Sequence, residues 1–393
     1  MKTSDANLTN ALIHLGRDHQ SRGRSVNLPI YQASTMLFNN LEEFEQARDT
    51  RYEKGTLYYG RYGTPATFEL ENMMTELEHG VGCVAVSSGL TACVVSLMAF
   101  AKAGSHVLVA DTVYGPTRAF CDNVLTGYGV EITYFDPMLG ADLALLVQAN
   151  TAAVFFEAPG SGSFEVPDIP AIAHVASAAG AVSILDGTWA TPLLCQPLTL
   201  GVDVVVHSGS KYISGHSDAM LGLIVAGSQV HYDKVRKMSL SIGDRAGAND
   251  VFLALRGLRT LAVRLRQHAQ STVACIAWLE QQPSVDRILH PSHSDCPGHE
   301  HWHRDFSGSA GLFSVVFKPG LENKVRHMIN NLSLFGIGLS WGGFESLILP
   351  VDPSPYRTAT TWSATGPTVR FNIGLEDVDS LLSDLDAGFA YLS

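Results

Sequence analysis

The sequence is poor in charge and contains no long uninterrupted apolar run. Charged residues make up 16% of its 393 residues and hydrophobic residues 46%. This composition excludes an intrinsically disordered chain and predicts a large folded core, with room for two domains. No window approaches the roughly 18 apolar residues that suggest a membrane-spanning helix, so we expect no membrane segment.

The sequence has fewer basic than acidic residues. The chain has 26 lysine and arginine residues against 38 aspartate and glutamate residues, which gives a formal net charge of −12. An acidic surface repels phosphate backbones and anionic lipid headgroups, so we expect neither a nucleic acid nor a membrane as a partner.

Closely spaced cysteines and a secretory signal are also missing. The six cysteines are scattered without a CxxC pair, which fits a reducing compartment better than a disulfide framework. The first twenty residues carry Asp5 and Asp18 and no apolar stretch of signal-peptide length. We therefore expect a cytoplasmic protein.

The common nucleotide-binding motifs are absent as well. There is no GxGxxG, which excludes the dinucleotide-binding and kinase patterns. Lys211 stands among small residues in HSGSK, but Ser210 precedes it where a phosphate-binding P-loop requires glycine. The lysine therefore needs another explanation.

The chain does contain short apolar runs that alternate with helix-like segments. Continuous apolar strands between helices indicate an α/β fold with a mainly parallel sheet covered on both faces. After about residue 255 the pattern changes to a smaller α+β unit with strands near 311–319 and 368–374 and a helix near 375–392. We predict an N-terminal arm at 1–60, a large domain at 61–255 and a small C-terminal domain at 256–393. The strands predicted in the large domain are residues 83–88, 106–111, 130–135, 152–157, 181–186 and 202–208.

Polar residues follow several of these strands, where ligands gather in parallel sheets. Ser87, Ser88 and Gly89 precede an apolar helix, whose N-terminus could bind a phosphate, although Ser88 could also be a simple helix cap. Asp186 and Lys211 end two further strands. A lysine amine can form a Schiff base with an aldehyde, and a carboxylate can hold a protonated pyridine nitrogen. Together with a phosphate site, they point to pyridoxal 5′-phosphate (PLP).

Segments along the whole chain resemble the cysteine/methionine-metabolism family of PLP-dependent enzymes. SGSKYISGHSDAMLG, around Lys211, is similar to the cofactor-lysine segment of the family, and LDGTWATP, around Asp186, to its Asp-Asn-Thr-Trp segment. SWGGFESL resembles the bacterial cystathionine β-lyases, because family members that act at Cγ usually have leucine in place of Trp341. The further similar segments, in the same order as in the family, are YYGRYGTPAT (58–67), EAPGSGSFEV (157–166) and VRFNIGLEDVDSLLSDLDAGF (369–389).

The resemblance implies fold type I of the PLP-dependent transferases, the aspartate-aminotransferase-like fold. It also implies a homotetramer built as a dimer of dimers, with active sites shared between subunits. Lys211 would form the Schiff base with PLP and then act as the catalytic base, and Asp186 would pair with the pyridine nitrogen. Tyr114 would stack on the cofactor ring, although a lone aromatic residue could equally be part of the core.

The remaining implied roles concern the phosphate and the substrate. Gly89, Leu90, Ser208 and Ser210 would bind the cofactor phosphate, completed by Tyr59 and Arg61 of a neighbouring subunit. Arg370 would bind the substrate carboxylate, because its planar guanidinium matches an oxyanion. Ser340 would assist it, and Trp341 would line the pocket.

The resemblance implies a carbon–sulfur β-lyase that cleaves cystathionine or related S-substituted cysteines to a thiol, pyruvate and ammonia, in methionine metabolism. Gly187 stands where the family usually has asparagine. Tyr62, Ala119 and Leu339 replace an arginine, an acidic residue and a tyrosine of bacterial β-lyases, and these changes suggest a substrate with a less polar far end. γ-Elimination or replacement, racemisation, and a non-catalytic regulatory protein on the same fold remain as alternatives.

A histidine-rich stretch, residues 290–303, is the last feature of note. Its density of histidine could suggest zinc, but its spacings fit no standard metal site. We expect a solvated loop near the substrate entrance and no metal.

Overall fold

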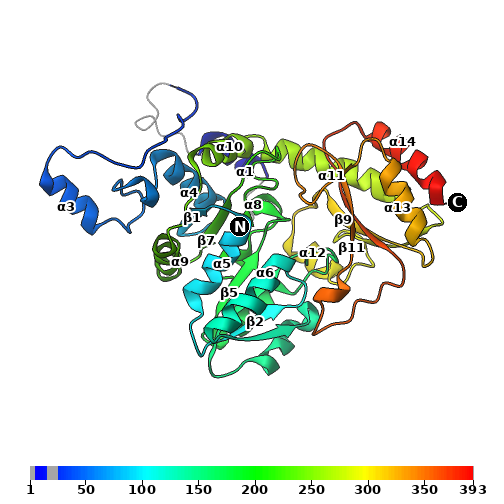
Figure 1. The fold of residues 1–393 in the computed structure, drawn as a ribbon, viewed down its shortest axis with the longest axis horizontal. Helices are drawn as coiled ribbons and strands as arrows, with labels where there is room; N and C mark the ends of the chain where they lie inside the picture. Colours follow the sequence, from blue (N-terminus) through cyan, green and yellow to red (C-terminus); the bar gives the residue numbers. More distant parts are fainter. Residues whose placement is uncertain (1–4, 16–24, 393) are drawn as a thin grey trace.

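The computed structural model describes residues 5–15 and 25–392. It shows two units, each built around its own sheet and joined along α11 (Figure 1). We call the first sheet with its helices the large unit and the second sheet with its helices the small unit. None of the helices in the described part of the chain is both long and apolar enough to cross a membrane.

The described residues of the large unit form a seven-stranded sheet in the order β1-β7-β6-β5-β4-β2-β3. β7 runs antiparallel to both of its neighbours, and the strands from β6 to β3 run parallel to one another. All six predicted strands lie in this sheet, whereas β7 was not predicted. The strands are β1 (Gly82–Val86), β2 (His106–Ala110), β3 (Glu131–Phe135), β4 (Thr151–Glu157), β5 (Val182–Asp186), β6 (Val204–Ser208) and β7 (Gly222–Ala226).

Four helices of the large unit begin at a residue whose side chain caps them, namely α4, α5, α7 and α9. Ser88 accepts a hydrogen bond from the Thr91 N–H at the start of α5, and Thr64 accepts one from Thr67 at the start of α4. α5 then packs across β4 to β7 and seals the apolar strands from water. The helices are α4 (Pro65–Leu77), α5 (Gly89–Phe100), α6 (Gly115–Phe120), α7 (Ile169–Ala178), α8 (Thr191–Leu194), α9 (Gln229–Ile242) and α10 (Ala248–Leu258).

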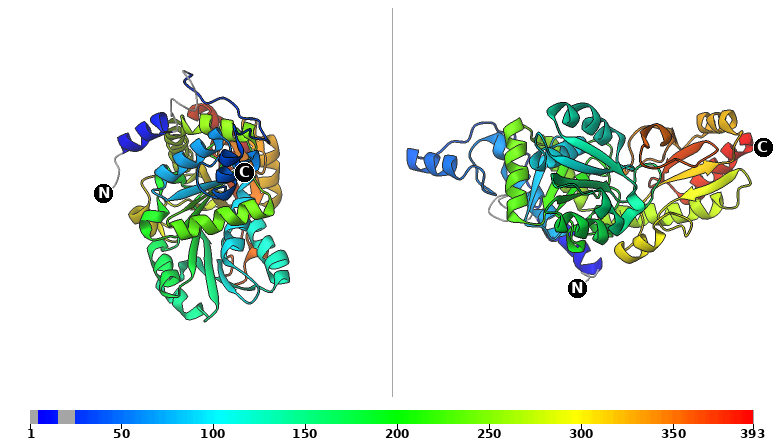
Figure 2. Two further views of the ribbon diagram at one scale, coloured as in Figure 1. Left: turned by 90° about the vertical axis from the view of Figure 1, so that its left-hand side faces the viewer. Right: turned by 90° about the horizontal axis from the view of Figure 1, so that it is seen from below.

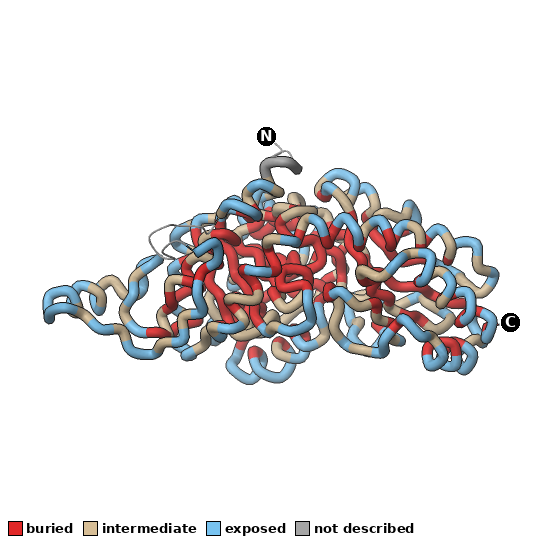
Figure 3. The backbone as a smooth tube through the Cα atoms, turned by 90° about the horizontal axis from the view of Figure 1, so that it is seen from above, coloured by how far each residue is buried: buried red, intermediate tan, exposed pale blue. Residues whose placement is uncertain are grey.

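The small unit has a five-stranded sheet in the order β10-β11-β12-β9-β8 within the described residues. Most of its buried apolar residues form a second cluster, whereas Leu289, Leu312 and Val316 pack with the cluster of the large unit. Figure 3 shows buried segments inside both units. The predicted strands near 311–319 and 368–374 are β9 and β12, and the predicted C-terminal helix is α14. The elements are α11 (Leu261–Leu279), β8 (Val285–Leu289), α12 (His299–Asp305), β9 (Leu312–Phe317), α13 (Glu322–Asn331), β10 (Gly336–Ile337), β11 (Leu347–Val351), β12 (Thr368–Asn372) and α14 (Val378–Phe389).

The N-terminal region lies outside both sheets. α1 (Asp5–His14) packs on the large unit and buries Leu12. α3 (Leu41–Asp49) buries no residue and projects from the body, as Figure 2 also shows from below. Leu37 and Leu41 on this projection are 93% and 73% exposed, which is unusual for leucine and leaves an apolar surface without a cover.

Candidate active site

The predicted cofactor residues lie at one edge of the large sheet. β4, β5 and β6 are parallel and adjacent, so their carboxyl ends, Glu157, Asp186 and Ser208, lie side by side. The hydroxyl of Thr188 connects two of these ends, because it donates to the Asp186 carboxylate and accepts from the Ser208 N–H at 2.8 Å.

Asp186 is a buried carboxylate with few partners. It accepts the Thr188 N–H at 3.0 Å, and the Cys93 thiol lies 3.7 Å from its other oxygen. Burial raises the pKa of Asp186 above its ordinary value, while the hydrogen bonds from Thr188 lower it and so favour the charged form. A buried carboxylate of this kind is suited to a cationic group of a ligand.

Lys211 is half-buried, and its amine faces the small unit. Its Nζ lies 2.9 Å from the Ser340 hydroxyl and 5.4 Å from the centroid of the Trp341 ring. Burial lowers the pKa of Lys211 to about 8, with Arg370 adding to the effect and Asp186 opposing it. About a tenth of the amine is therefore unprotonated at pH 7, far more than for an exposed lysine, and the unprotonated form is the one that attacks an aldehyde.

The phosphate-site prediction concerns the N-terminus of α5 and the end of β6. A Cβ added at Gly89 would lie 2.5 Å from the Ser208 Cβ and 2.6 Å from its hydroxyl oxygen, so only glycine permits this close approach. The Ser88 hydroxyl accepts the Thr91 N–H, so this serine acts as a helix cap, which was the simpler of its two interpretations. The Ser210 hydroxyl accepts from the Leu221 N–H at 3.0 Å, which holds it within the loop that joins β6 to β7.

Tyr114 is not a core residue, because 46% of it is exposed. It lies directly before α6, and its N–H donates to the Glu157 carboxylate at 2.7 Å. Burial raises the pKa of the Tyr114 hydroxyl, and the charges of Glu157 and Asp186 add to this effect. The ring is therefore held near Asp186 with a face left accessible.

Arg370 and Ser340 come together from the small unit. Arg370 lies on β12 and donates to the carbonyl oxygens of Leu339 at 2.8 Å and Ser340 at 3.3 Å. These contacts place the guanidinium beside the segment that touches Lys211. Trp341 packs against Tyr212 with 5.5 Å between ring centroids, which fixes the indole next to the lysine.

Tyr59 and Arg61 are not brought to this group in the structure. Tyr59 is 42% exposed and makes an isolated bridge to Thr35. Arg61 donates to the Leu240 carbonyl oxygen and stacks on the Tyr62 ring at 4.7 Å.

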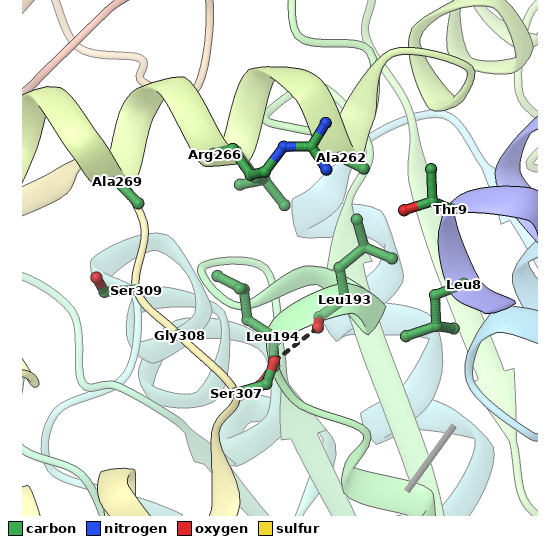
Figure 4. Close-up of a pocket in the computed structure, with 11 residues that line it drawn as sticks. Leu8, Thr9, Leu193, Leu194, Ala262, Arg266, Ala269, Ser307, Gly308 and Ser309 are labelled. Atoms are coloured by element: carbon green, nitrogen blue, oxygen red, sulfur yellow. Dashed lines mark hydrogen bonds between the residues drawn. The ribbon is translucent and has the colours of Figure 1, made fainter. Parts of the chain in front are cut away.

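Two further regions lie outside the group around Lys211. A cavity of about 210 Å³ between α1, α8 and α11 is lined mainly by apolar residues, among them Leu8, Leu193 and Leu194 (Figure 4). In the histidine-rich stretch, His290 and Cys296 are buried, so the expectation of a solvated loop is wrong for them. Burial lowers the pKa of His290 to about 4, which keeps it neutral. Among the described residues, no three His, Cys, Asp or Glu side chains are grouped as metal ligands.

Comparison with known proteins identifies the family. The family model for Cys/Met metabolism PLP-dependent enzymes matches residues 9–390. The chain belongs to this family. PLP is therefore its cofactor, and the resemblance seen in the sequence is confirmed. The donor set fits PLP, because a buried carboxylate, a lysine amine of lowered pKa and a helix N-terminus opened by Gly89 share one sheet edge.

Three relatives show how closely the chain follows the family. It is 42% identical to cystathionine beta-lyase MetC of Escherichia coli over 98% of this chain and 99% of that protein. The structure of metB from Corynebacterium glutamicum matches with a TM-score of 0.89 and 31% identity, covering 98% of both chains. Cystathionine gamma-lyase from Lactobacillus plantarum, solved with L-serine, matches with a TM-score of 0.88 and 29% identity, over 98% of this chain and 99% of that one. The fold is fold type I, as predicted.

Two residues of the site were not predicted. Glu157 positions the Tyr114 backbone, and Thr188 donates to Asp186. Glu157 could have been found by the same rule as Asp186, since it is the last residue of a predicted strand. Thr188 carries no comparable signal, because threonine after an aspartate is common in turns.

Proposed function

We propose that the protein is a PLP-dependent carbon–sulfur β-lyase that acts on cystathionine or a related S-substituted cysteine. The reaction would break the Cβ–S bond, consume one water and release a thiol, pyruvate and ammonia. The observation that carries the proposal is the contact between Lys211 and Ser340, which brings an amine of lowered pKa against the Ser-Trp pair. The β-lyase name of the E. coli relative supports the same reaction.

The cofactor would be held by residues of the large unit. Asp186 would pair with the pyridine nitrogen, Tyr114 would stack on the ring, and Lys211 would form the Schiff base. When bound, PLP supplies an electron sink for negative charge formed at the substrate Cα. The phosphate would lie at the N-terminus of α5, against Gly89, Leu90, Ser208 and Ser210.

The residues of the chain then perform three tasks. Arg370 binds the substrate carboxylate through its planar guanidinium and so orients the Cα–H bond. Lys211, once free, removes the Cα proton, which its lowered pKa permits near neutral pH. Ser340 holds the lysine amine in position by a hydrogen bond at 2.9 Å. The leaving thiolate needs little further help, because sulfur stabilises negative charge.

The far end of the substrate pocket favours a less polar substituent. Leu339 is 83% exposed next to Ser340, and Ala119 is exposed on α6. Neither offers a charge to the second amino-acid group of cystathionine, and Tyr62 replaces an arginine of the bacterial β-lyases. Simple S-alkyl cysteines are therefore proposed beside cystathionine as substrates.

A shared active site in a homotetramer of the dimer-of-dimers type is part of the proposal. The exposed apolar residues of the projecting arm support it, as does the position of Tyr59 and Arg61 apart from Lys211. Mixing a Tyr59→Ala/Arg61→Ala variant with Lys211→Ala, followed by subunit exchange, would restore about a quarter of the sites if they are shared. No recovery after proven exchange would contradict sharing. We also propose a cytoplasmic location and a role in methionine metabolism, the former supported by six buried free cysteines.

The decisive experiment is a product screen with the purified holoenzyme. Pyruvate from cystathionine and a panel of S-alkyl cysteines supports the β-lyase, whereas 2-oxobutyrate from cystathionine supports γ-elimination. D-alanine formed from L-alanine would indicate racemisation. Cofactor bound with none of these conversions would indicate a regulatory protein. The γ-lyase name of the L. plantarum relative makes the second outcome the main rival.

A further inference from the structure

One segment of the small unit crosses to the large unit beside the active site. It comprises residues 352–367 and connects β11 to β12, the strand that carries Arg370. In Figure 1 it is the orange segment that passes between the two units. We call it the crossing segment.

The crossing segment is bound by a buried carboxylate of the large unit. Asp111 directly follows β2, and its side chain is fully buried. It accepts the successive N–H groups of Thr358, Ala359 and Thr360 at 3.0, 3.1 and 2.8 Å, and the Thr360 hydroxyl at 2.7 Å. Three consecutive backbone donors around one carboxylate form a compact anion-binding nest.

Arg118 completes this contact from α6. Its guanidinium lies 2.8 Å from the Asp111 carboxylate and also donates to the Thr358 hydroxyl at 2.6 Å. It stacks on the Tyr134 ring at 3.5 Å, so its own position is set by the large unit. The buried charge of Asp111 is therefore both paired and hydrogen-bonded, the condition under which a buried carboxylate is stable.

A second ionic contact lies on the other side of the segment. Arg357 donates to the Glu165 carboxylate at 3.0 Å and to the Ser163 hydroxyl at 2.5 Å. The Arg357 side chain is only 5% exposed and that of Glu165 13% exposed. In this second contact, the small unit supplies the cation and the large unit the anion, so the segment is held at two points.

The crossing segment is close to both halves of the proposed substrate site. Asp111 is three residues before Tyr114, and the crossing segment leads directly into the strand of Arg370. The Tyr356 ring lies 4.0 Å from where a Cβ of Gly115 would be, which places the segment against the start of α6. A shift of the segment would therefore move Arg370 relative to Tyr114.

We propose that Asp111 and Glu165 are positioning residues that latch the crossing segment to the large unit and so set the position of Arg370 relative to the cofactor. The role given to Arg370 rests on the proposed function, whereas the latch itself does not. Opening the latch should weaken binding of the substrate carboxylate more than it slows the chemical step, because Lys211 and Asp186 belong to the large unit.

The first measurement is tryptic cleavage of the Arg357–Thr358 bond, which needs no catalytic activity. We expect wild-type apoenzyme to resist cleavage there, because Arg357 is buried in its contacts. Asp111→Asn, which places an amide against three N–H donors, should be cleaved at this bond. Equal resistance of the two proteins would overturn the latch, whatever reaction the enzyme catalyses.

The second measurement is steady-state kinetics with whichever amino acid the holoenzyme converts. For Asp111→Asn we expect KM to rise about tenfold and kcat to change less than about threefold. Cleavage at Arg357 with an unchanged KM would overturn the link to Arg370 while leaving the proposed lyase activity intact. A tenfold fall in kcat with an unchanged KM would also overturn the link to Arg370.

Three further variants distinguish opening of the latch from a general loss of folding. Asp122→Asn removes the other carboxylate near Arg118, at 3.8 Å, without touching the crossing segment, and should match wild type in both measurements. Thr360→Val removes only one hydroxyl donor, and Glu165→Gln leaves Arg357 a neutral acceptor. Both variants should show more cleavage at Arg357 and a higher KM than wild type, with smaller changes than Asp111→Asn. Changes seen only in Asp122→Asn would contradict the proposal.

Discussion

The cofactor end and the far end of the proposed active site are built in opposite ways. At the cofactor end, short contacts join Thr188 to Asp186 and to Ser208, and Lys211 to Ser340 of the small unit. At the far end, Leu339 is 83% exposed. Tyr62 contacts Arg61 and follows the projecting helix α3 in the sequence. The buried end has geometry and charge suited to a chemical step, while the exposed end is left open to the substrate. Substitutions should therefore affect catalysis at one end and substrate choice at the other.

The strongest test of the buried end is Lys211→Ala. Loss of the amine removes both the Schiff base and the proposed base, so we expect kcat to fall by at least about 10³-fold. Borohydride reduction followed by peptide mapping should label residue 211 in wild type and not in the variant. Lys234→Ala, at a lysine on α9, is the matched control and should retain both label and rate. Turnover by Lys211→Ala would remove the proposed mechanism.

Asp186→Asn should have the next largest effect. It keeps the size of the side chain and removes the buried charge proposed to hold the pyridine nitrogen, so we expect kcat to fall about 10²-fold. Titration of the visible absorption band of the bound cofactor gives a second readout, which should shift in the variant. Asp233→Asn, on the exposed side of α9, should change neither value. An unchanged spectrum in Asp186→Asn would place the carboxylate away from the ring.

The lowered pKa of Lys211 predicts how cofactor uptake depends on pH. Only the unprotonated amine attacks the aldehyde, and the pKa of Lys211 is lowered to about 8 by burial. The rate of PLP uptake by apoenzyme should therefore rise about tenfold per pH unit below this value and level off above it. Stopped-flow absorbance measures this directly. A rate that continues to rise towards pH 10 would show that the amine titrates like an exposed lysine, whose pKa is about 10.4.

The same contrast explains what could be predicted from the sequence. Asp186 and Lys211 follow apolar strands, and parallel strands bring their carboxyl ends together, so topology alone predicts that they are neighbours. The Asp111 latch could not be predicted, because it joins residues nearly 250 positions apart through backbone N–H groups that leave no trace in residue type. β7 was not predicted because no helix separates it from β6. It follows the loop that carries Lys211 and so interrupts the alternation of strands and helices. The burial of His290 and Cys296 depends on how residues 290–303 pack against the large unit, which their polar composition hides.

The smallest expected effect belongs to the exposed end, and it tests the comparison most directly. Leu339→Tyr with Tyr62→Arg restores a hydroxyl and a guanidinium that could bind the second amino-acid group of cystathionine. We expect kcat/KM for cystathionine to rise about three- to tenfold and that for S-methylcysteine to stay unchanged. Leu339→Phe alone restores the ring without a polar group, so it should give no gain. An equal gain on both substrates would mean that the two positions act on the common part of the substrate. The separation between a catalytic end and a selective end would then be wrong, because residues far from Lys211 would be contributing to the chemical step.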